Sequence, residues 1–288
     1  MTIKSILVPL DGSDGAADAL NTAKAVAADH VAHIDVLHVR ANPRDSVPLL
    51  GEGMSGAMLE DIVQATQQET ERRAAIAREM FDVLCAEDGI TESDDPPANE
   101  GVTASWRSLE GREDEVVALQ GRLADLIVVP RPVDDATVSA TLTLNAALVE
   151  TGRGVLVVPP GGAGAVGRKI AISWNGSAEA ARAVAAAMPL ILAADAVKVL
   201  TVDMDQSGNA MAADLARYLR AHGVTAAIET SPVIEQNVGE TVLSRCADWG
   251  ADLLVMGAYT HSRLRQLIMG GVTRHVLDEA TIPVILVH

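Results

Sequence analysis

The residues best suited to binding chemistry follow a short apolar stretch near the carboxyl terminus. Gly257 ends this stretch, Thr260 stands three residues later, and Gly270 stands ten residues after Thr260. In an open parallel sheet, ligands bind beyond the carboxyl ends of the strands, where the connections diverge. A glycine there lets the backbone approach a phosphate, and Gly271-Val272-Thr273 can open a helix whose N–H groups and dipole favour an anion. The spacing predicts a phosphate-binding loop, with the Thr273 hydroxyl as one more donor.

Two arginines, Arg263 and Arg265, lie inside this loop. They are near enough in sequence to neutralise phosphate charge. Exposed arginines on an acidic protein are equally expected to be solvated surface residues. Both interpretations stay open at this point.

The elements that must position this loop occur twice along the chain. Segment 4–13 matches 169–177, segment 124–129 matches 251–256, and segment 155–158 matches 284–287. The offset between matching residues shrinks from 164 (12 to 176) to 127 (124 to 251), so the first copy carries about 37 extra residues, which fit the segment 42–99. A length of 288 residues, about twice that of a usual domain, agrees with two domains.

Within each copy, apolar runs of about five residues alternate with longer stretches of 3.6-residue period, which is typical of βαβ units around a parallel sheet. The expected strands are 5–9, 33–39, 101–108, 124–129 and 154–158, then 169–174, 196–202, 224–231, 252–256 and 283–287. The expected helices are 14–29, 55–88, 112–122 and 137–151, then 177–193, 207–222, 238–249 and 271–280. The Pro- and Gly-rich stretch that begins at Pro159 predicts a linker at 160–168 between domains at 1–159 and 169–288.

The segment 256–273 resembles the universal stress protein signature, in which glycine, two residues, glycine, nine residues, glycine and then Ser or Thr surround phosphates. Segments 6–13, 37–39 and 282–287 also resemble that family. The resemblance implies two tandem flavodoxin-like or Rossmann-like α/β domains, each a five-stranded parallel sheet of order 3-2-1-4-5 with helices on both faces. It also implies that the last strands, Val155–Val158 and Val284–Val287, pair across a pseudo-two-fold axis as in a dimer. Whether two chains associate further is left open.

The sequence departs from the family pattern at several positions. Thr260 replaces the second glycine, where a Cβ at positive φ would cost on the order of 1 kcal/mol or more. Gly271 replaces the Ser or Thr, and Asn175 replaces an early acidic residue. The first copy keeps that acid as Asp11, but prolines at 130 and 132 remove donors where a phosphate loop would need them. The first copy is therefore expected to be degenerate, with a structural or partner-binding role.

The resemblance implies a non-enzymatic stress regulator that responds to an adenine nucleotide, ATP or AMP, in the second copy, with Mg²⁺ only alongside ATP. The resemblance also implies a regulatory protein as a second class of partner. The alternative is an interaction scaffold in which both sites have decayed. No catalytic nucleophile and base stand together, and no convincing Mg²⁺ ligands for a slow ATPase can be named.

Trp174 fits a packing role better than base stacking. The implied base and ribose contacts are Ser173, Trp174, Asn175 and Val202, and the implied phosphate contacts are Gly257, Thr260, Gly270, Gly271, Val272 and Thr273.

Composition narrows the classes of partner. A formal net charge of −17 and an isoelectric point near 4.7 argue against nucleic acid and membrane surfaces. No secretory signal or membrane-spanning run is recognisable, so a cytoplasmic protein is expected. Cys85 and Cys246 lack CxxC spacing and are expected as reduced thiols, while His38, His261 and His275 have no metal-ligand or triad spacing. The GxGxxG match at 51–56 lies outside a strand-to-helix turn and predicts a flexible loop.

Overall fold

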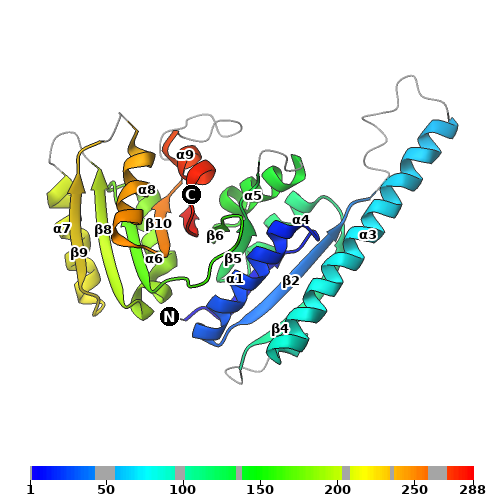
Figure 1. Ribbon diagram of the computed structural model, residues 1–288, viewed down its shortest axis with the longest axis horizontal. Helices are drawn as coiled ribbons and strands as arrows, with labels where there is room; N and C mark the ends of the chain where they lie inside the picture. The colour runs from blue at the N-terminus through cyan, green and yellow to red at the C-terminus, as the bar shows by residue number, and fades with distance from the viewer. Residues whose placement is uncertain are drawn as a thin grey trace.

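Alternating strands and helices fill both halves of the chain in the computed structural model, which describes residues 2–42, 56–94, 101–133, 138–202, 208–233, 237–258 and 271–288 (Figure 1). The first half contains β1 (Ser5–Pro9), α1 (Asp14–His30), β2 (His33–Arg40), α3 (Gly56–Asp88), β3 (Thr91–Glu92), β4 (Thr103–Glu110), α4 (Glu113–Gly121), β5 (Leu126–Pro130), α5 (Val138–Glu150) and β6 (Gly154–Val158). The second half contains β7 (Lys169–Ser173), α6 (Ala178–Ala193), β8 (Ala196–Val202), α7 (Gly208–Ala221), β9 (Ala226–Ser231), α8 (Val238–Trp249), β10 (Leu253–Gly257), α9 (Gly271–Glu279) and β11 (Val284–Val287).

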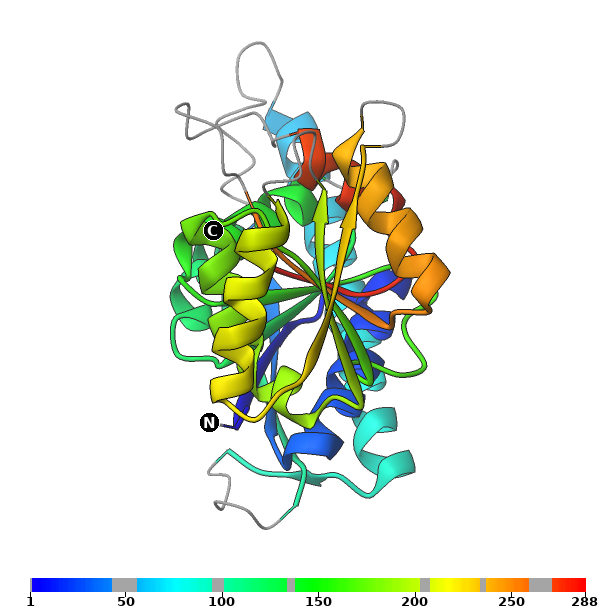
Figure 2. The same ribbon diagram turned by 90° about the vertical axis from the view of Figure 1, so that its left-hand side faces the viewer.

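The strands form one sheet of order β3-β4-β2-β1-β5-β6-β11-β10-β7-β8-β9. Apart from β3, each half has the expected order 3-2-1-4-5, and its strands are parallel. The two halves meet where β6 and β11 pair antiparallel, with Leu156 opposite Ile285. The expected pairing of the last strands is confirmed. Figure 2 shows the twist that accumulates along this sheet and the helices on its two sides.

Two differences from the sequence expectation stand at the edges of elements. The first half has a sixth strand, β3, whose two residues are both exposed and therefore carry no apolar pattern. The fourth strand of each half begins later than the apolar residues in the sequence suggest. Asp125 and Asp252 stand just before these strands and hydrogen-bond to the start of another strand. Asp125 accepts hydrogen bonds from the N–H groups of Lys4 (2.8 Å) and Ser5 (3.1 Å), and Asp252 accepts from the segment 167–169. Each aspartate thus fixes the start of the first strand of its half.

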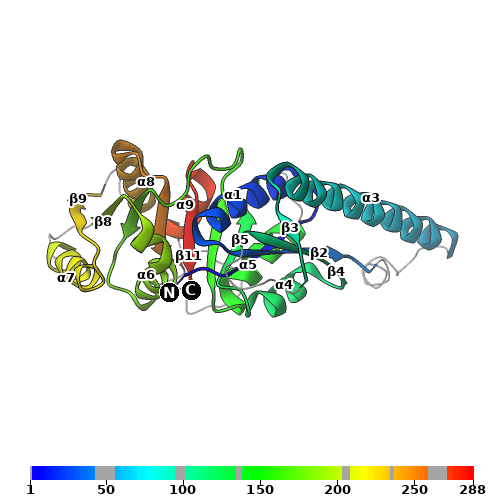
Figure 3. The same cartoon turned by 90° about the horizontal axis from the view of Figure 1, so that it is seen from below.

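About half of the surplus of the first copy lies in the helix α3, which is 33 residues long where α7 of the second half has 14. Its carboxyl-terminal half packs on the sheet through Ala77, Phe81 and Leu84, all buried. Its amino-terminal half extends past the sheet, as Figure 3 shows. The carboxyl-terminal half of α3 therefore adds to the core of the first half of the chain, and its amino-terminal half does not.

Two hydrophobic cores, one on each face of the sheet, run through both halves. On one face the strands pack against α1, α3, α6 and α7, and on the other against α4, α5, α8 and α9. Small and branched aliphatic residues make up almost all of both cores, as expected from an aromatic content of 2%. No helix in the described ranges combines the length and apolarity needed to cross a membrane.

Two helices end in the same left-handed conformation with different residues. The residue after α8 is Gly250, at φ 69° and ψ 43°. The residue after α1 is Val31, at φ 52° and ψ 59°. A β-branched side chain in this region is strained, whereas glycine is the usual occupant.

Candidate functional site

The first strand of each half ends in the same turn. Asp11 Oδ1 accepts the N–H of Ser13 at 3.0 Å, and Asn175 Oδ1 accepts the N–H of Ser177 at 3.1 Å. Each serine then caps the following helix, its hydroxyl accepting the N–H three residues on. Because the amide oxygen makes the same bond as the carboxylate, replacing aspartate by Asn175 preserves the turn. Asn175 is exposed at the carboxyl edge of the sheet.

The two turns differ in what covers them. A Cβ placed on Gly12 would lie 2.9 Å from the backbone oxygen of Arg73, so the first-half turn lies directly beneath α3. A Cβ placed on Gly176 would lie 3.0 Å from the Sδ atom of Met211, a side chain of α7 that is 39% exposed. The first turn is covered by helix backbone, while the cover of the second turn among the described residues is a flexible side chain.

Gly257, at the end of β10, is tightly packed by its own protein. A Cβ at this position would lie 2.5 Å from the backbone nitrogen of Ala180 and 2.6 Å from the carbonyl carbon of Glu179. In the first half the glycine lies on the other element: Pro130 ends the matching strand, β5, and Gly15 lies on the helix α1. A Cβ placed on Gly15 would lie 3.1 Å from Pro130. The glycine at this crossing is therefore explained by strand-to-helix packing, whether or not a phosphate approaches.

Trp174 follows β7 and is half-buried against the core on the α6 side. Its backbone N–H donates to Leu200 O at 2.8 Å, which extends the ladder with β8. Its indole Nε1 is buried and has no hydrogen-bond partner in the described structure. An unpaired buried donor costs about 1–3 kcal/mol. The packing role expected for Trp174 is present, together with an unused donor.

The other predicted base and ribose residues lie on neighbouring strand ends. Ser173 is half-buried and stands opposite Leu200 on β8 and Met256 on β10 in the sheet register. Val202 ends β8, half-buried against the core on the opposite face from Trp174. The structure thus gathers Ser173, Asn175 and Gly257 at one edge, with Val202 one strand away.

The predicted phosphate residues are only partly described. Gly271 begins α9 and is exposed, and a Cβ placed on it has no atom of the described residues within 4 Å. Val272 is half-buried, and Thr273 is 4% exposed, so its hydroxyl is less available than its position in the sequence suggests. Thr260, Gly270 and the two loop arginines lie outside the described residues.

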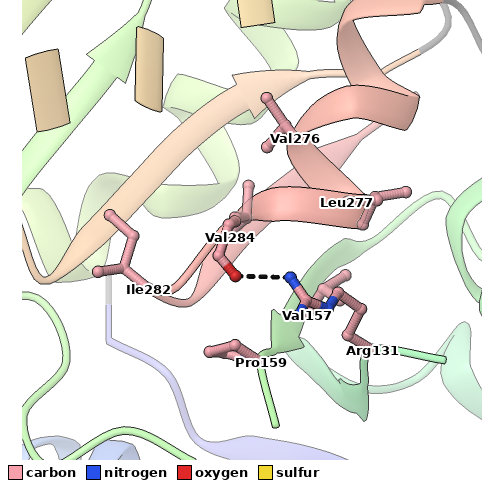
Figure 4. A pocket seen from close by; sticks show the side chains of 8 residues that line it. Arg131, Val157, Pro159, Val276, Leu277, Ile282 and Val284 are labelled. Atoms are coloured by element: carbon pink, nitrogen blue, oxygen red, sulfur yellow. Dashed lines mark hydrogen bonds between the residues drawn. The ribbon is translucent and has the colours of Figure 1, made fainter. Parts of the chain in front are cut away.

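In the first half, the position of a phosphate loop is taken by a contact between the two halves. Arg131 follows β5, and its Nη1 donates to the carbonyl oxygen of Ala280, just past the end of α9, at 2.6 Å (Figure 4). The small apolar pocket around it is lined from both halves, by Val157 and Pro159 and by Val276, Leu277, Ile282 and Val284. A guanidinium at a helix carboxyl terminus also complements the helix dipole. This arginine ties the halves together.

The histidines and cysteines that the structure describes show no arrangement of metal ligands. His38 Nδ1 lies 2.7 Å from Leu10 O, and His275 Nδ1 lies 3.2 Å from Asn237 Nδ2, while His261 is outside the described residues. Cys85 and Cys246 are free, and burial raises the pKa of Cys246 to about 12. No group of three or more His, Cys, Asp or Glu side chains that could hold a metal occurs in the described part of the chain.

Two segments of the chain match a known protein family. The model of the universal stress protein family matches residues 2–149 and 168–288. The chain belongs to the universal stress protein family. The two matched segments show that it carries two universal stress protein domains in tandem. The domain boundaries given above, at 159 and 169, stay predictions.

Solved structures of the same architecture span nearly the whole chain. A universal stress protein from Archaeoglobus fulgidus is 13% identical, covers 98% of this chain and 97% of its own, and has a TM-score of 0.67. A Pseudomonas aeruginosa protein described as functionally unknown is 16% identical, covers 99% of this chain and 92% of its own, and has a TM-score of 0.56. At these identities the likeness concerns the fold. No curated protein matches the chain.

Proposed function

We propose that the second domain binds an adenine nucleotide, ATP or AMP, at the carboxyl edge of β7 and β10, and that the protein is a non-enzymatic regulator. The base and ribose would contact Ser173, Trp174, Asn175 and Val202. The phosphates would lie over the first turn of α9, with Mg²⁺ only when the ligand is ATP. Membership of the universal stress protein family and the loop spacing from Gly257 to Gly271 support this assignment.

The observation that carries the proposal is the difference between the two carboxyl edges. The backbone of α3 and the contact made by Arg131 close the first edge. At the second edge Asn175 and Gly271 are exposed, and among the described residues the one atom within 4 Å of a Cβ placed on Gly176 belongs to the Met211 side chain. The first N–H groups of a helix have no partner within the helix, so the start of α9 favours an anion there. The described residues thus cover the first edge more closely than the second, which favours the second domain as the one that binds the ligand.

The unpaired Trp174 N–H is consistent with a ligand near this edge. A nucleotide nitrogen or oxygen that accepted this bond would remove the cost of the buried donor. Asn175 can add a hydrogen bond to a ribose hydroxyl through its amide nitrogen, since its oxygen is already used by the turn. The side chains present therefore fit an adenine nucleoside better than a purely apolar ligand.

Equilibrium dialysis of the freshly purified protein against ATP, ADP and AMP, with and without Mg²⁺, tests the proposal. We expect saturable binding of one nucleotide per chain. A Trp174→Phe variant should bind about 5- to 150-fold more weakly, because the loss of one buried hydrogen bond costs about 1–3 kcal/mol. A Trp106→Phe variant in the first domain serves as the matched control and should bind like the parent. Absence of binding at millimolar nucleotide would refute the proposal.

A second candidate function is an interaction scaffold without a nucleotide. The specific observation in its favour is Gly271, which leaves α9 without the hydroxyl of the family signature. Under this alternative, a bulky residue at Gly270 would leave partner binding unchanged. Under the nucleotide proposal, the same substitution abolishes ligand-dependent behaviour.

A further inference from the structure

Each half of the sheet carries an ion pair between two neighbouring strands, on the face that α4, α5, α8 and α9 cover. In the first half, an Nη2–Oδ1 distance of 3.3 Å separates Arg107 of β4 from Asp35 of β2. In the second half, Lys198 Nζ of β8 lies 2.7 Å from Glu229 Oε2 of β9. Figure 1 shows the two pairs of strands toward opposite ends of the sheet.

The two ion pairs occupy equivalent places in the repeated domain. Leu37 on β2 and Leu200 on β8 each accept a backbone hydrogen bond from the residue just past the first strand of their half, at 2.9 Å and 2.8 Å. In each half, one member of the ion pair stands two residues before this leucine, and the other stands directly opposite it in the sheet register. The halves have therefore kept the places of the two charges and exchanged their signs.

Both ion pairs are partly buried, since the four side chains are between 15% and 39% exposed. The helix that covers each half adds a contact. Arg107 donates to Gln120 of α4 at 3.0 Å, and the Lys198 ammonium lies 5.0 Å from the ring centroid of Trp249 on α8. Partly buried charges are screened less by salt than charges on an open surface. Their signs therefore affect which strands can lie side by side.

The strands β2 and β8 are alike in the other features that select a neighbouring strand. Both pair in parallel with the next strand outward. On the opposite face both present two buried branched aliphatic residues, Ile34 and Val36 in β2 and Val197 and Val199 in β8. The outward strands differ more on that face, with Trp106 in β4 and Ile228 in β9. Wrong assembly between similar domains is a characteristic failure of multidomain and repeat proteins.

We propose that the opposite signs of the two ion pairs direct each strand to the partner in its own domain while the tandem chain folds. If β9 paired with β2 in the same register, Glu229 would stand beside Asp35. If β4 paired with β8, Arg107 would stand beside Lys198. Like charges on cross-strand neighbours are destabilising, so both exchanges are disfavoured. Repulsion of the wrong partner is a general means of telling similar partners apart.

This inference concerns folding and does not depend on nucleotide binding. A variant that exchanges the signs of the first ion pair tests it. Asp35→Lys with Arg107→Glu keeps an attractive pair inside the domain, and both wrong pairings become attractive. We expect the ratio of misfolded to native protein to rise by about 2- to 30-fold, because each wrong pairing changes from repulsion to attraction. Size-exclusion chromatography after refolding from urea measures the ratio, at a protein concentration at which the parent gives a measurable misfolded fraction.

Carbodiimide cross-linking identifies the strands that have paired, because it joins an amine to a carboxyl group in direct contact with it. In the native parent it should join Lys198 to Glu229. In the misfolded fraction of the double variant, mass spectrometry should find position 35 joined to Glu229, or position 107 joined to Lys198. A misfolded fraction that contains links only within each domain contradicts the proposal.

Exchange of the second ion pair separates wrong pairing from a general loss of stability. Lys198→Asp with Glu229→Arg should by itself raise the misfolded ratio in the same way. All four substitutions together should return the ratio to that of the parent, because the two halves again carry opposite signs. A general loss of stability predicts the reverse, since the fourfold variant loses the native contacts of both pairs.

The ion pair between Lys24 of α1 and Asp88 of α3, at 2.8 Å, supplies the matched control. Its side chains are 32% and 36% exposed, and Lys24→Asp with Asp88→Lys should leave the misfolded ratio unchanged. Either double variant refolding like the parent, or a fourfold variant refolding worse than both double variants, would overturn the proposal.

Discussion

Restoring a hydroxyl at Gly271 offers the sharpest test of the phosphate site. The residue is the first of α9 and is exposed, and a Cβ placed on it meets no atom of the described residues within 4 Å. Gly271→Ser therefore adds a side chain that clashes with none of the described residues. Serine is also a better residue than glycine at a helix start. The substitution recreates the residue type that the family signature has at this position.

The expected gain in affinity follows from the strength of one hydrogen bond. A hydrogen bond from a hydroxyl to a charged phosphate oxygen contributes about 1.5–3 kcal/mol, which is about 10- to 150-fold in affinity. Gly271→Ala is the matched control, because it adds the same Cβ and the same helix preference without the hydroxyl. Isothermal titration with ATP and AMP should show Gly271→Ser binding at least about 10-fold more tightly than Gly271→Ala. Equal affinities for the two variants would refute the placement of phosphates over α9.

Three further predictions concern stability and can be measured by denaturant or thermal unfolding. Val31→Gly should be more stable than Val31→Ala by about 1 kcal/mol, since only glycine relieves the left-handed φ, and Gly250→Ala should cost a similar amount at a site where its Cβ meets nothing. Equal stabilities of the two Val31 variants would contradict this. Gly257→Ala should cost about 1–3 kcal/mol or more, because its Cβ would meet the backbone of α6, and an unchanged unfolding midpoint would argue against that crossing. Arg131→Ala should cost about 1.5–3 kcal/mol through the lost bond to Ala280, and a neutral result would show that the bond contributes little between the halves.

Most of the fold follows from local sequence. Runs such as Ile6–Val8 and Leu253–Met256 are long enough for strands and too short for helices, and serines 13 and 177 mark helix starts. The polar, exposed strand β3 could not be recognised, because two residues carry no periodicity. The start of β5 was placed too early, since Asp125 interrupts the apolar run to bind the start of β1.

The candidate site was predicted less completely because its meaning depends on contacts between distant segments. Sequence identified Gly257 as a residue that must lack a side chain, but the atoms that require this belong to Glu179 and Ala180 on α6.

The antiparallel contact between β6 and β11 has an evolutionary consequence. In an association of separate identical chains, every substitution appears on both sides of the interface, so each partner must tolerate the change. A short covalent connection between the domains replaces that association by an intramolecular one with a high effective concentration. The partner is then always the other domain and never a second copy of the same one. Each domain can therefore change alone, as the exchanged glycine at Gly15 and Gly257 illustrates. A chain built in this way can evolve different ligand specificities at the carboxyl edges of its two domains.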